Sequence, residues 1–572
     1  MRVGTLLTAC LAGGMAIQAA PSKDASFQSL ARLVVEETLR FSPETATQMG
    51  DHRWDDRLSD MSAQGIEKQI LWARHMSGLV RRIQPGQLSP DQRVDRKILL
   101  DNLDATLQDL TELQTWRWDP LGYNPGGALD QLLSRDFAPL GQRLASVKGR
   151  LLLVPALLAS ARANLANPPK IYTETAIQQF QGTLALVKDG VTEAAASVGM
   201  KDDLSPAQAV AAKALEEFIA WMKADLLPRS GGNFRIGRTA YRKKLRTTLS
   251  SDLSPEAILA RAEKSIKTLH GEMAEAAKPL FRAWFPDQKE PAPPVLVKAV
   301  LDRIADRHPD NGTMVEQATR DLEEATTFVR THDLLTLPNT PVRVKVTPEY
   351  ARGIAGAYCE ATGPLEKDGT TFYCIDPTPS DWTPTRVASY FREYNDAMLR
   401  DLTVHEAMPG HYVQLALSNR YQGATMVRAV FSSGLFAEGW AVYSEQLMAR
   451  AGYGGREVHL QQLKMRLRVA INAILDQKIQ AGSMTEAQAM ALMMEQGFQE
   501  EGEAAGKWKR ACLSSTQLST YFVGASEMDD LRAASEAKAK RAGKGFDLKA
   551  HHDALLSHGT LAPKYARMLM GL

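Results

Sequence analysis

The sequence has few cysteines, no strong net charge and no low-complexity tract. Its 572 residues include four cysteines, and 68 basic residues against 66 acidic ones give a net charge of +2. Both signs are mixed along the chain, which excludes the basic stripe of a nucleic-acid-binding protein and a polybasic membrane patch. The apolar fraction of 44% is enough for a substantial core and excludes intrinsic disorder. We therefore expect a small or peptide-like substrate as the partner, and no nucleic acid.

The N-terminal segment predicts export. Arg2 precedes an apolar stretch over residues 3–20, which is typical of a signal peptide at residues 1–20. Leu7-Thr8-Ala9-Cys10 also fits a bacterial lipoprotein processing site, and this alternative would leave a lipid anchor on Cys10. No later segment has the uncharged length to span a bilayer. We expect a periplasmic or secreted mature chain without a transmembrane segment, either free or held as a lipoprotein.

Two of the remaining cysteines could form a disulfide. Cys359 and Cys374 flank a segment that contains the turn pair Asp368-Gly369, so the two cysteines would face each other across a hairpin. In an oxidising compartment they would form a disulfide. Two free buried thiols are the alternative, and the sequence leaves both open.

Helical periodicity dominates the chain. Apolar residues recur at three- and four-residue spacing over residues 26–40, 63–84, 91–113, 140–165 and 173–198. Helix starts are predicted where a serine precedes a proline, at Ser89-Pro90, Ser205-Pro206 and Ser254-Pro255. The fold class we predict is mainly α.

The middle of the chain departs from this helical pattern. Val342–Val346 alternates as a strand does, and residues 353–358 and 371–375 are short, rich in Gly, Tyr and Phe and bounded by turn residues. They predict a small sheet with a hairpin. Joints near residues 226–237 and 286–294 are candidate boundaries, and we divide the mature chain, residues 21–572, into an N-terminal helical half (21–245) and a catalytic half (246–572).

A candidate metal site follows this predicted sheet. Zinc hydrolases need three protein ligands, an open position for water and a carboxylate that takes the proton of the water. His405-Glu406 ends an apolar helical stretch, and His411 follows six residues after His405. On a regular helix this spacing turns the second histidine about 120° away from the first. Pro409-Gly410 would have to distort the helix, as by a two-residue bulge, for both imidazoles to reach one ion.

Two further segments offer partners for this site. Glu438 and Glu445 are seven residues apart, hence on one face of a predicted helix with aromatic neighbours. We expect Glu438 to be the third metal ligand and Glu445 to support a ligand histidine by a hydrogen bond. Tyr521 is the candidate donor to the oxyanion that forms when water attacks a carbonyl. The alternatives are solvent-facing glutamates and a core tyrosine.

The chain resembles a bacterial family known as domain of unknown function 885, whose members carry an HExxPGH signature. The residues that match are Thr403–Gln414, Glu438–Glu445, Leu475-Asp476, Gln517–Gly524 and Phe546–Leu556. One departure is Ser515-Thr516, where the family pattern has Pro-Gly. The resemblance implies a large helical zincin-like metallopeptidase, with a small sheet beside the active-site helix. It also implies that His405, His411 and Glu438 bind Zn²⁺, that Glu406 is the general base and that Tyr521 stabilises the oxyanion.

The function we expect is that of an exported zinc-dependent hydrolase, a peptidase on short peptides that uses zinc-activated water with Glu406 as general base. Two alternatives stay open: a zinc hydrolase of non-peptide amides or esters, and a non-catalytic peptide-binding protein with a metal site. A general base beside the first histidine argues against the last of these, because a structural metal site has no need of it.

Overall fold

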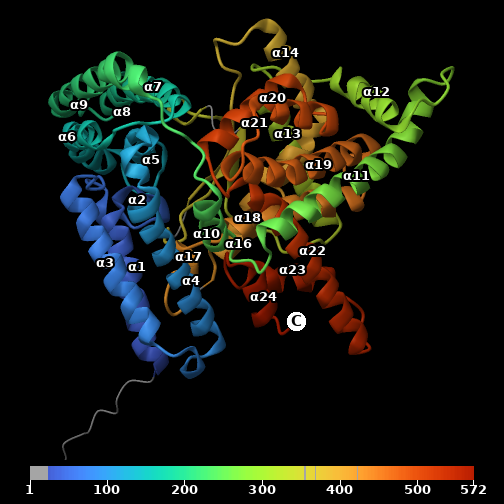
Figure 1. The fold of residues 1–572 in the computed structure, drawn as a ribbon, viewed down its shortest axis with the longest axis horizontal. Helices are drawn as coiled ribbons and strands as arrows, with labels where there is room; N and C mark the ends of the chain where they lie inside the picture. Colours follow the sequence, from blue (N-terminus) through green and yellow to red (C-terminus); the bar gives the residue numbers. More distant parts are fainter. Residues whose placement is uncertain (1–22, 353–355, 367–368, 422) are drawn as a thin grey trace, which may run out of the picture.

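Helices form nearly all of the fold in the computed structural model of this chain, which describes residues 23–352, 356–366, 369–421 and 423–572. The signal segment and Cys10 lie outside the described residues. The helices gather in a left-hand and a right-hand group in Figure 1. The prediction of a mainly α protein with a small sheet is therefore confirmed.

The left-hand group contains the first nine helices. They are α1 (Lys23–Phe41), α2 (Pro43–Met49), α3 (Ala63–Arg82), α4 (Pro90–Gln108), α5 (Gly126–Ser134), α6 (Leu140–Asn164), α7 (Lys170–Ala185), α8 (Val191–Ser197) and α9 (Lys201–Trp221). The apolar side chains of α5 to α9 form a core of their own, whereas those of α1, α3 and α4 belong to the larger core of the catalytic half. The N-terminal half is thus joined to the catalytic half by shared packing.

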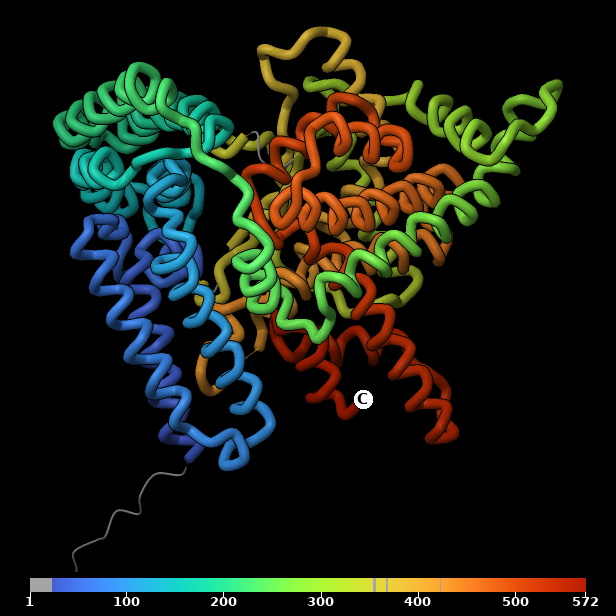
Figure 2. Tube along the Cα trace, in the orientation of Figure 1, coloured from blue at the N-terminus to red at the C-terminus, as the bar shows by residue number. Residues whose placement is uncertain are grey.

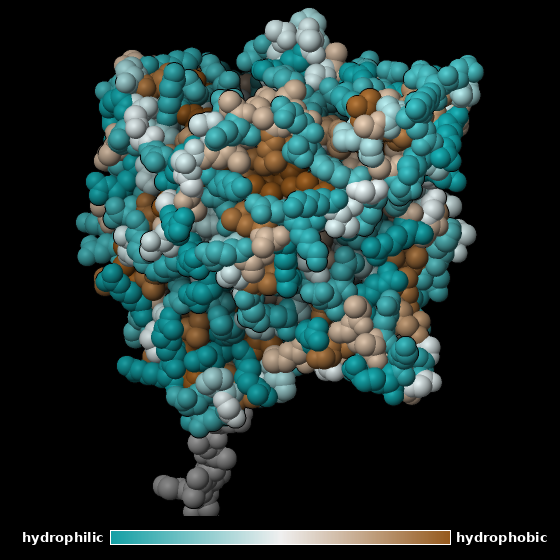
Figure 3. All heavy atoms as spheres, turned by 45° about the vertical axis from the view of Figure 1, so that its right-hand side comes forward, coloured by the Kyte–Doolittle hydropathy of each residue, from teal (hydrophilic) through white to brown (hydrophobic). Residues whose placement is uncertain are grey.

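Helix α6 bears on our expectation about membrane segments. By length and composition alone it is apolar enough to cross a membrane, a property that packed core helices share. It packs on α9 and α5 and buries Leu144, Leu151 and Leu158 in the N-terminal core. Figure 3 shows a mostly hydrophilic face of the molecule, with apolar areas confined to patches and to a hollow in its upper half. Lys148 and Arg150 interrupt its apolar stretch, so α6 does not have the uncharged length that our expectation required.

The remaining helices belong to the half that we expect to be catalytic, except that α10 crosses the boundary drawn after residue 245. They are α10 (Arg238–Leu249), α11 (Pro255–Trp284), α12 (Pro293–Ala305), α13 (Met314–Thr331), α14 (Pro384–Glu393), α15 (Asp396–Glu406), α16 (His411–Ser418), α17 (Val427–Val430), α18 (Gly434–Arg450), α19 (Gly455–Gln480), α20 (Glu486–Ala491), α21 (Glu501–Leu513), α22 (Leu518–Arg541), α23 (Leu548–Leu556) and α24 (Pro563–Leu569). The extended segment before α10 descends between the two groups in Figure 2. Helix α19, buried along most of its length, is the central helix against which α11, α15 and α22 pack.

Serine–proline pairs mark helix starts at two of the three predicted places. Helices α4 and α11 begin at Pro90 and Pro255, and the Ser254 hydroxyl accepts a hydrogen bond from the Ala257 N–H at 3.2 Å. Ser205-Pro206 instead lies inside α9, which begins at Lys201. Pro206 is the sixth residue of α9, past the first four N–H groups that lack intrahelical acceptors, so it removes one hydrogen bond from the second turn of the helix.

The small sheet has three strands in the order β1-β3-β2. Strand β1 (Val342–Val346) pairs in parallel with β3 (Thr371–Ile375), and β2 (Ala357–Glu360) pairs with β3 in antiparallel fashion. The predicted hairpin is therefore present, and β2 is an edge strand. Of the segment predicted as a strand before β3, residues 353–355 lie outside the described residues.

The register of the hairpin shows whether Cys359 and Cys374 can form a disulfide. Tyr358 lies opposite Cys374, and Cys359 lies opposite Tyr373. Neighbouring residues of a strand point to opposite faces, so the two thiols lie on opposite faces of the sheet. Both cysteines are free, and the disulfide alternative is wrong.

Candidate metal centre

The helix that carries His405 ends immediately after the next residue. Helix α15 stops at Glu406, and α16 starts at His411, so residues 407–410 are not helical. We expected the helix to be distorted by a bulge of two residues. The distortion is larger, because the helix ends at Glu406 and a new helix begins at His411. The Gly410 N–H turns back to the Val404 carbonyl at 2.9 Å, and Trp440 Nε1 donates to the Pro409 carbonyl at 2.9 Å.

Gly410 allows this sharp return of the chain. A Cβ atom at position 410 would lie 1.9 Å from the His405 carbonyl oxygen and 2.4 Å from that of Val404. Both neighbours are main-chain atoms, which cannot move without breaking the end of α15. The absence of a side chain at Gly410 is therefore what lets His411 approach His405.

The break brings three side chains to one point. The His405 and His411 rings lie 4.8 Å apart at 87°. Glu438, on α18, places Oε2 3.6 Å from His405 Nε2 and 3.3 Å from His411 Nε2. One ligand atom from each of the three lies within 4.8 Å of the others.

These three residues fit a zinc ion by their chemistry and spacing. Zinc–ligand bonds of about 2.0 to 2.1 Å in a tetrahedron separate the ligand atoms by about 3.3 to 3.4 Å, close to the distances between Glu438 and the two histidines. Oε2 of Glu438 is buried and accepts no hydrogen bond from the described residues. A buried carboxylate oxygen without a partner is costly, so this atom has the environment of a ligand that faces a cation.

The charges around the two histidines favour a cation at their centre. Burial opposes ionisation of Glu438, yet the imidazoles of His405 and His411 beside its carboxylate hold its pKa well below the usual value. Burial also disfavours a charged imidazole, but Glu438 and Glu445 raise the pKa of His405 well above its usual value. The same carboxylates that attract a proton to His405 would attract a metal ion.

Glu445 lies behind His405. Its Oε1 atom is 2.6 Å from His405 Nδ1, which leaves Nε2 to face Glu438 and His411. Asp401, one turn before His405 on α15, is buried beside this pair. Burial raises the pKa of Asp401 and of Glu445, and the charge of Glu445 raises that of Asp401 further. The two carboxyls therefore hold a proton more firmly than either would alone.

Tyr521, on α22, lies on the other side of His405, with the two rings stacked 6.2 Å apart. Its hydroxyl accepts hydrogen bonds from Arg510 Nη2 at 2.6 Å and from Gln517 Nε2 at 3.1 Å. Gln517 Nε2 also lies 3.2 Å from Glu438 Oε1. Since two N–H donors occupy the lone pairs of the Tyr521 oxygen, its own proton is free to be donated elsewhere. Burial raises the pKa of Tyr521, which keeps that proton in place.

Two glycines let α22 approach α18 closely enough to bring Tyr521 to the metal ligands. A Cβ at Gly524 would lie 2.3 Å from the Leu435 carbonyl oxygen, and one at Gly439 would lie 2.5 Å from the Gly524 carbonyl carbon. Thr516, just before α22, has φ of 70°, a left-handed conformation that favours glycine. Its N–H is held by Asp476 Oδ1 at 2.8 Å. The departure from Pro-Gly at Ser515-Thr516 thus leaves Tyr521 in place.

A cavity of about 1020 Å³ opens on these residues. Its lining includes His405, Glu406, His411, Glu438 and Tyr521 together with side chains of α7, β2, α19 and α21. Oε2 of Glu406 is buried and has no hydrogen-bond partner among the described residues. The structure therefore brings the predicted site residues together at one cavity, apart from Glu445, which lies behind His405.

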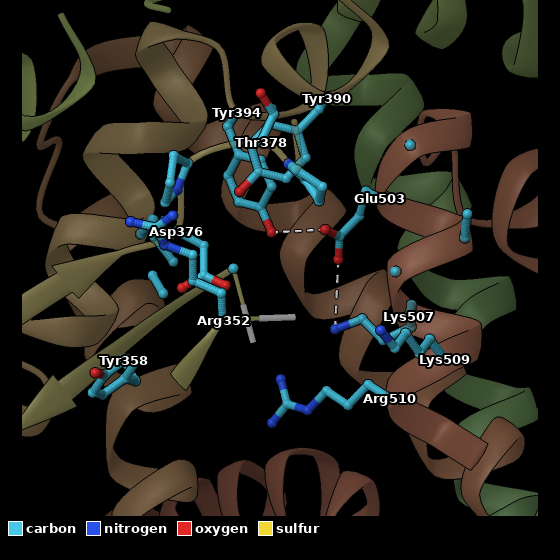
Figure 4. Close-up of a pocket in the computed structure, with 18 of the residues that line it drawn as sticks. Arg352, Tyr358, Asp376, Thr378, Tyr390, Tyr394, Glu503, Lys507, Lys509 and Arg510 are labelled. Carbon is cyan, nitrogen blue, oxygen red and sulfur yellow. Dashed lines mark hydrogen bonds and ion pairs between the residues drawn. The ribbon is translucent and has the colours of Figure 1, made fainter. Parts of the chain in front are cut away.

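Figure 4 shows the wall of this cavity that the sequence analysis missed. Glu503, Lys507 and Arg510 project from α21 on one side, and Asp376 and Arg352 lie on the opposite side. The spacing of four and three residues on α21 was the available signal, but it is common on solvated helices. His551 and His552, the other histidine pair, lie on α23 outside the lining of the cavity, and His552 bonds to Tyr443 at 2.9 Å.

Two solved structures resemble the chain along almost its full length. One is a protein from Shewanella oneidensis described as a "putative lipoprotein of unknown function", with 33% identity, a TM-score of 0.78, and coverage of 96% of this chain and 100% of that one. The other is a "putative lipoprotein" from Colwellia psychrerythraea, with 17% identity, a TM-score of 0.79, and coverage of 96% and 99%. The second likeness, at its low identity, shows the fold alone. No curated protein matches the chain.

The family comparison agrees with the fold-wide likeness. The model of a family described as "Bacterial protein of unknown function (DUF885)" matches residues 43–570. This range contains the helix break at residues 407–410, the three clustered ligand residues and the helix that carries Tyr521. The chain therefore belongs to this bacterial family, DUF885.

Proposed function

We propose that the protein is a zinc-dependent peptidase that hydrolyses short peptides in the cavity between α7, β2 and α21. The observation that carries this proposal is the convergence of His405, His411 and Glu438 on one point, with Glu406 beside them on the cavity wall. A zinc ion held there would supply Lewis acidity for the attack of water on a carbonyl carbon.

The side chains around this point have complementary tasks. Glu406 takes the proton of the attacking water and passes it to the leaving amine. The Tyr521 hydroxyl donates a hydrogen bond to the carbonyl oxygen that becomes negative. Arg510 and Gln517 hold the phenol in position. Glu445 fixes the tautomer of His405 so that Nε2 faces the metal position.

Strand β2 favours a peptide over other amides. It is the edge strand of the sheet, and Ala357, Tyr358 and Cys359 line the cavity beside the end of α15. An extended peptide would add to this edge through main-chain hydrogen bonds, which would hold its carbonyl groups in line along the cavity. Proline at alternate positions of a bound peptide removes the N–H groups needed for this pairing, so affinity that is unchanged by such proline substitutions would contradict it.

Metal analysis and peptide hydrolysis test the proposal together. The zinc-loaded protein should cleave a library of short peptides, and Glu406→Gln should retain zinc while losing turnover. His411→Ala is the matched variant, which should lose both zinc and turnover. Hydrolysis that survives Glu406→Gln would overturn the mechanism. Ester and non-peptide amide substrates assayed beside the peptides would show whether a peptide is required.

We also propose that the protein is exported and anchored through a lipid on Cys10. The supporting observations are the apolar segment before residue 21 and the description of the Shewanella protein, 33% identical, as a lipoprotein. Metabolic labelling with palmitate should mark the wild-type chain and leave Cys10→Ala unlabelled. A soluble, unlabelled wild-type product cut near Ala20 would support the signal-peptide alternative instead.

A further inference from the structure

The cavity wall formed by α21 carries more positive than negative charge. Glu503, Lys507 and Arg510 are spaced by four and three residues, so all three lie on one face of α21. That face lines the cavity, as Figure 4 shows. Arg468 of α19 reaches the same region. A carboxylate in the cavity would therefore meet several cations on this side.

Two carboxylates near this wall, those of Glu393 and Glu503, are already bound to other side chains. Glu393 is fully buried and is bound by Lys464 Nζ at 2.8 Å, by Arg468 and by the Glu500 N–H at 2.8 Å. Glu503 accepts a hydrogen bond from the Tyr394 hydroxyl at 2.8 Å and lies 3.6 Å from Arg468 Nη1. Little of their negative charge is left for other cations.

Among the described residues, Lys507 and Arg510 have no close acidic partner on this wall. Lys507 is 8% exposed, and its only ion pair among the described residues is with Glu503 at 3.5 Å, the long end of the range. Arg510 donates to Tyr521 and Gln517, which are both neutral. On and behind this wall, four cations (Lys464, Arg468, Lys507 and Arg510) face two anions (Glu393 and Glu503); Arg510 also lies in the field of Glu438, which we assign to the metal.

A surplus of buried positive charge is costly unless an anion arrives to balance it. The pKa of Lys507 agrees with this surplus, because burial lowers it to about 8 and the nearby Arg510 and Arg468 add to the effect. Negative charge in the cavity would reverse that shift. The wall therefore has the charge of an anion-binding surface that remains open to the substrate cavity.

The position of this surface points to the substrate. Arg510 contacts Tyr521, which stacks on His405 beside the metal ligands. Lys507 lies three residues before Arg510 on α21, a rise of about 4.5 Å along the helix. A residue of extended peptide spans about 3.3 Å. A carboxylate at Lys507 would thus lie one or two peptide residues along the wall from Arg510, the side chain that holds Tyr521.

We propose that Lys507 and Arg510 form a subsite that binds a carboxylate of the substrate, an inference that rests on the peptidase function proposed above. The carboxylate belongs to the free C-terminus of a short peptide or to an acidic side chain next to the cleaved bond. In the first case the enzyme releases short C-terminal fragments, and in the second it selects acidic peptides.

Three peptides separate these sources: tetra-alanine with a free C-terminus, its C-terminal amide, and amidated peptides with one Glu in place of each Ala. Amidation should lower the wild-type kcat/KM at least 10-fold. If a Glu residue restores the rate to the amidated peptide, the side chain is the ligand; if it does not, the C-terminus is. Equal kcat/KM for all of these peptides would overturn the subsite.

Variants of α21 test which residue carries the effect. Lys507→Gln should remove the discrimination between free and amidated peptides, and Lys507→Arg should restore it. Lys478→Gln is the control, because it removes the same charge from α19, which packs on α21, at an exposed position outside the lining of the cavity. Discrimination that persists in Lys507→Gln, or is lost equally in Lys478→Gln, would refute a local subsite.

A binding measurement separates this inference from the peptidase function. Glu406→Gln protein loaded with zinc should bind free tetra-alanine at least 10-fold more tightly than the amide, or else the Glu-containing amides more tightly than the plain amide, by calorimetry. Such a preference in the absence of any wild-type hydrolysis would uphold the subsite and reject the peptidase. Hydrolysis with no preference for any carboxylate-bearing peptide in either assay would do the reverse.

Discussion

Buried charges in the two halves of the molecule are satisfied in different ways. In the N-terminal half, Arg150 is fully buried, and its guanidinium donates to the carbonyls of Arg57 and Ala128 and to the Thr47 hydroxyl. Arg143 likewise donates to the carbonyls of residues 132, 133 and 138. In the C-terminal half, several buried charges line a cavity. Among the described residues, Oε2 of Glu406 and Oε2 of Glu438 accept no hydrogen bond, and the ion pair of Lys507 with Glu503 is 3.5 Å long.

This difference separates structural charges from functional ones. A buried cation whose N–H groups all find main-chain acceptors links segments of the fold, and its removal leaves those acceptors unpaired. A buried charge that faces a cavity without a partner weakens the fold and is available for a ligand. The predictions below test this division, from the largest expected effect to the smallest.

The largest effect on stability should come from Arg150. Arg150→Met leaves several buried acceptors without donors and should lower the free energy of unfolding by about 3 to 5 kcal/mol. Lys507→Met, which removes a buried charge of the other kind, should change it by less than about 1 kcal/mol. Urea denaturation of the three proteins measures both. If both variants lose the same free energy of unfolding, the distinction between structural and functional buried charges is wrong.

Tyr521→Phe removes the proton that we assign to the oxyanion while it keeps the ring that stacks on His405. The kcat should fall about 100- to 1000-fold, or about 2.7 to 4 kcal/mol of barrier, with little change in KM. Zinc content should remain at the wild-type level. Tyr443→Phe is the matched control, since that hydroxyl bonds to His552 away from the cavity. An unchanged kcat in Tyr521→Phe would leave the oxyanion without its proposed donor.

Gly410→Ala should act on the metal rather than on the fold as a whole. The added Cβ would meet the His405 carbonyl at 1.9 Å, so His411 should be displaced and zinc affinity should fall by about 100-fold. Gly434→Ala, at the start of α18, is the control because a Cβ there would meet nothing within 4 Å. Titration with a zinc indicator measures both proteins, and normal affinity in Gly410→Ala would show that the helix break is not needed.

The smallest effect concerns pH. Lys507 has its pKa lowered to about 8, chiefly by burial, and faces Glu503, Arg468 and Arg510. Its positive charge is present below pH 8 and is lost above it, so preference for carboxylate-bearing peptides should decline about 10-fold as pH rises from 7 to 9. The ratio of kcat/KM for preferred and plain amidated peptides isolates this effect, since other groups act on both substrates. A ratio that stays constant across this range would remove Lys507 from the subsite.

Local patterns in the sequence were enough to predict much of the fold. The periodic segments, the starts of α4 and α11 and the strands of the hairpin follow from residue spacing and from turn and cap residues. Ser205-Pro206 misled the same reasoning, because a proline in the early turns of a helix carries the same local signature as one at its start. The strand register that separates Cys359 from Cys374 depends on pairing with β3, which no single segment encodes.

The site was predictable only in part, for a similar reason. The two histidines, Glu406 and Glu438 stand in short motifs, and Pro409-Gly410 explains how a spacing of six becomes compatible with one ion. Lys507 and Arg510 belong to no such motif, since their role depends on where α21 packs and on the carboxylates already taken by Arg468 and Lys464. Which charges meet inside a cavity depends on how the helices pack, so it could not be predicted from the sequence alone.

The central claim is that His405, His411 and Glu438 hold a zinc ion for which Glu406 is the general base. The most direct measurement is the zinc content and the peptide turnover of wild-type and Glu406→Gln proteins, prepared side by side. The account predicts one zinc per chain in both proteins and a loss of turnover of at least about 100-fold in the variant. Wild-type protein that binds no zinc, or a variant that hydrolyses peptides at the wild-type rate, would contradict it.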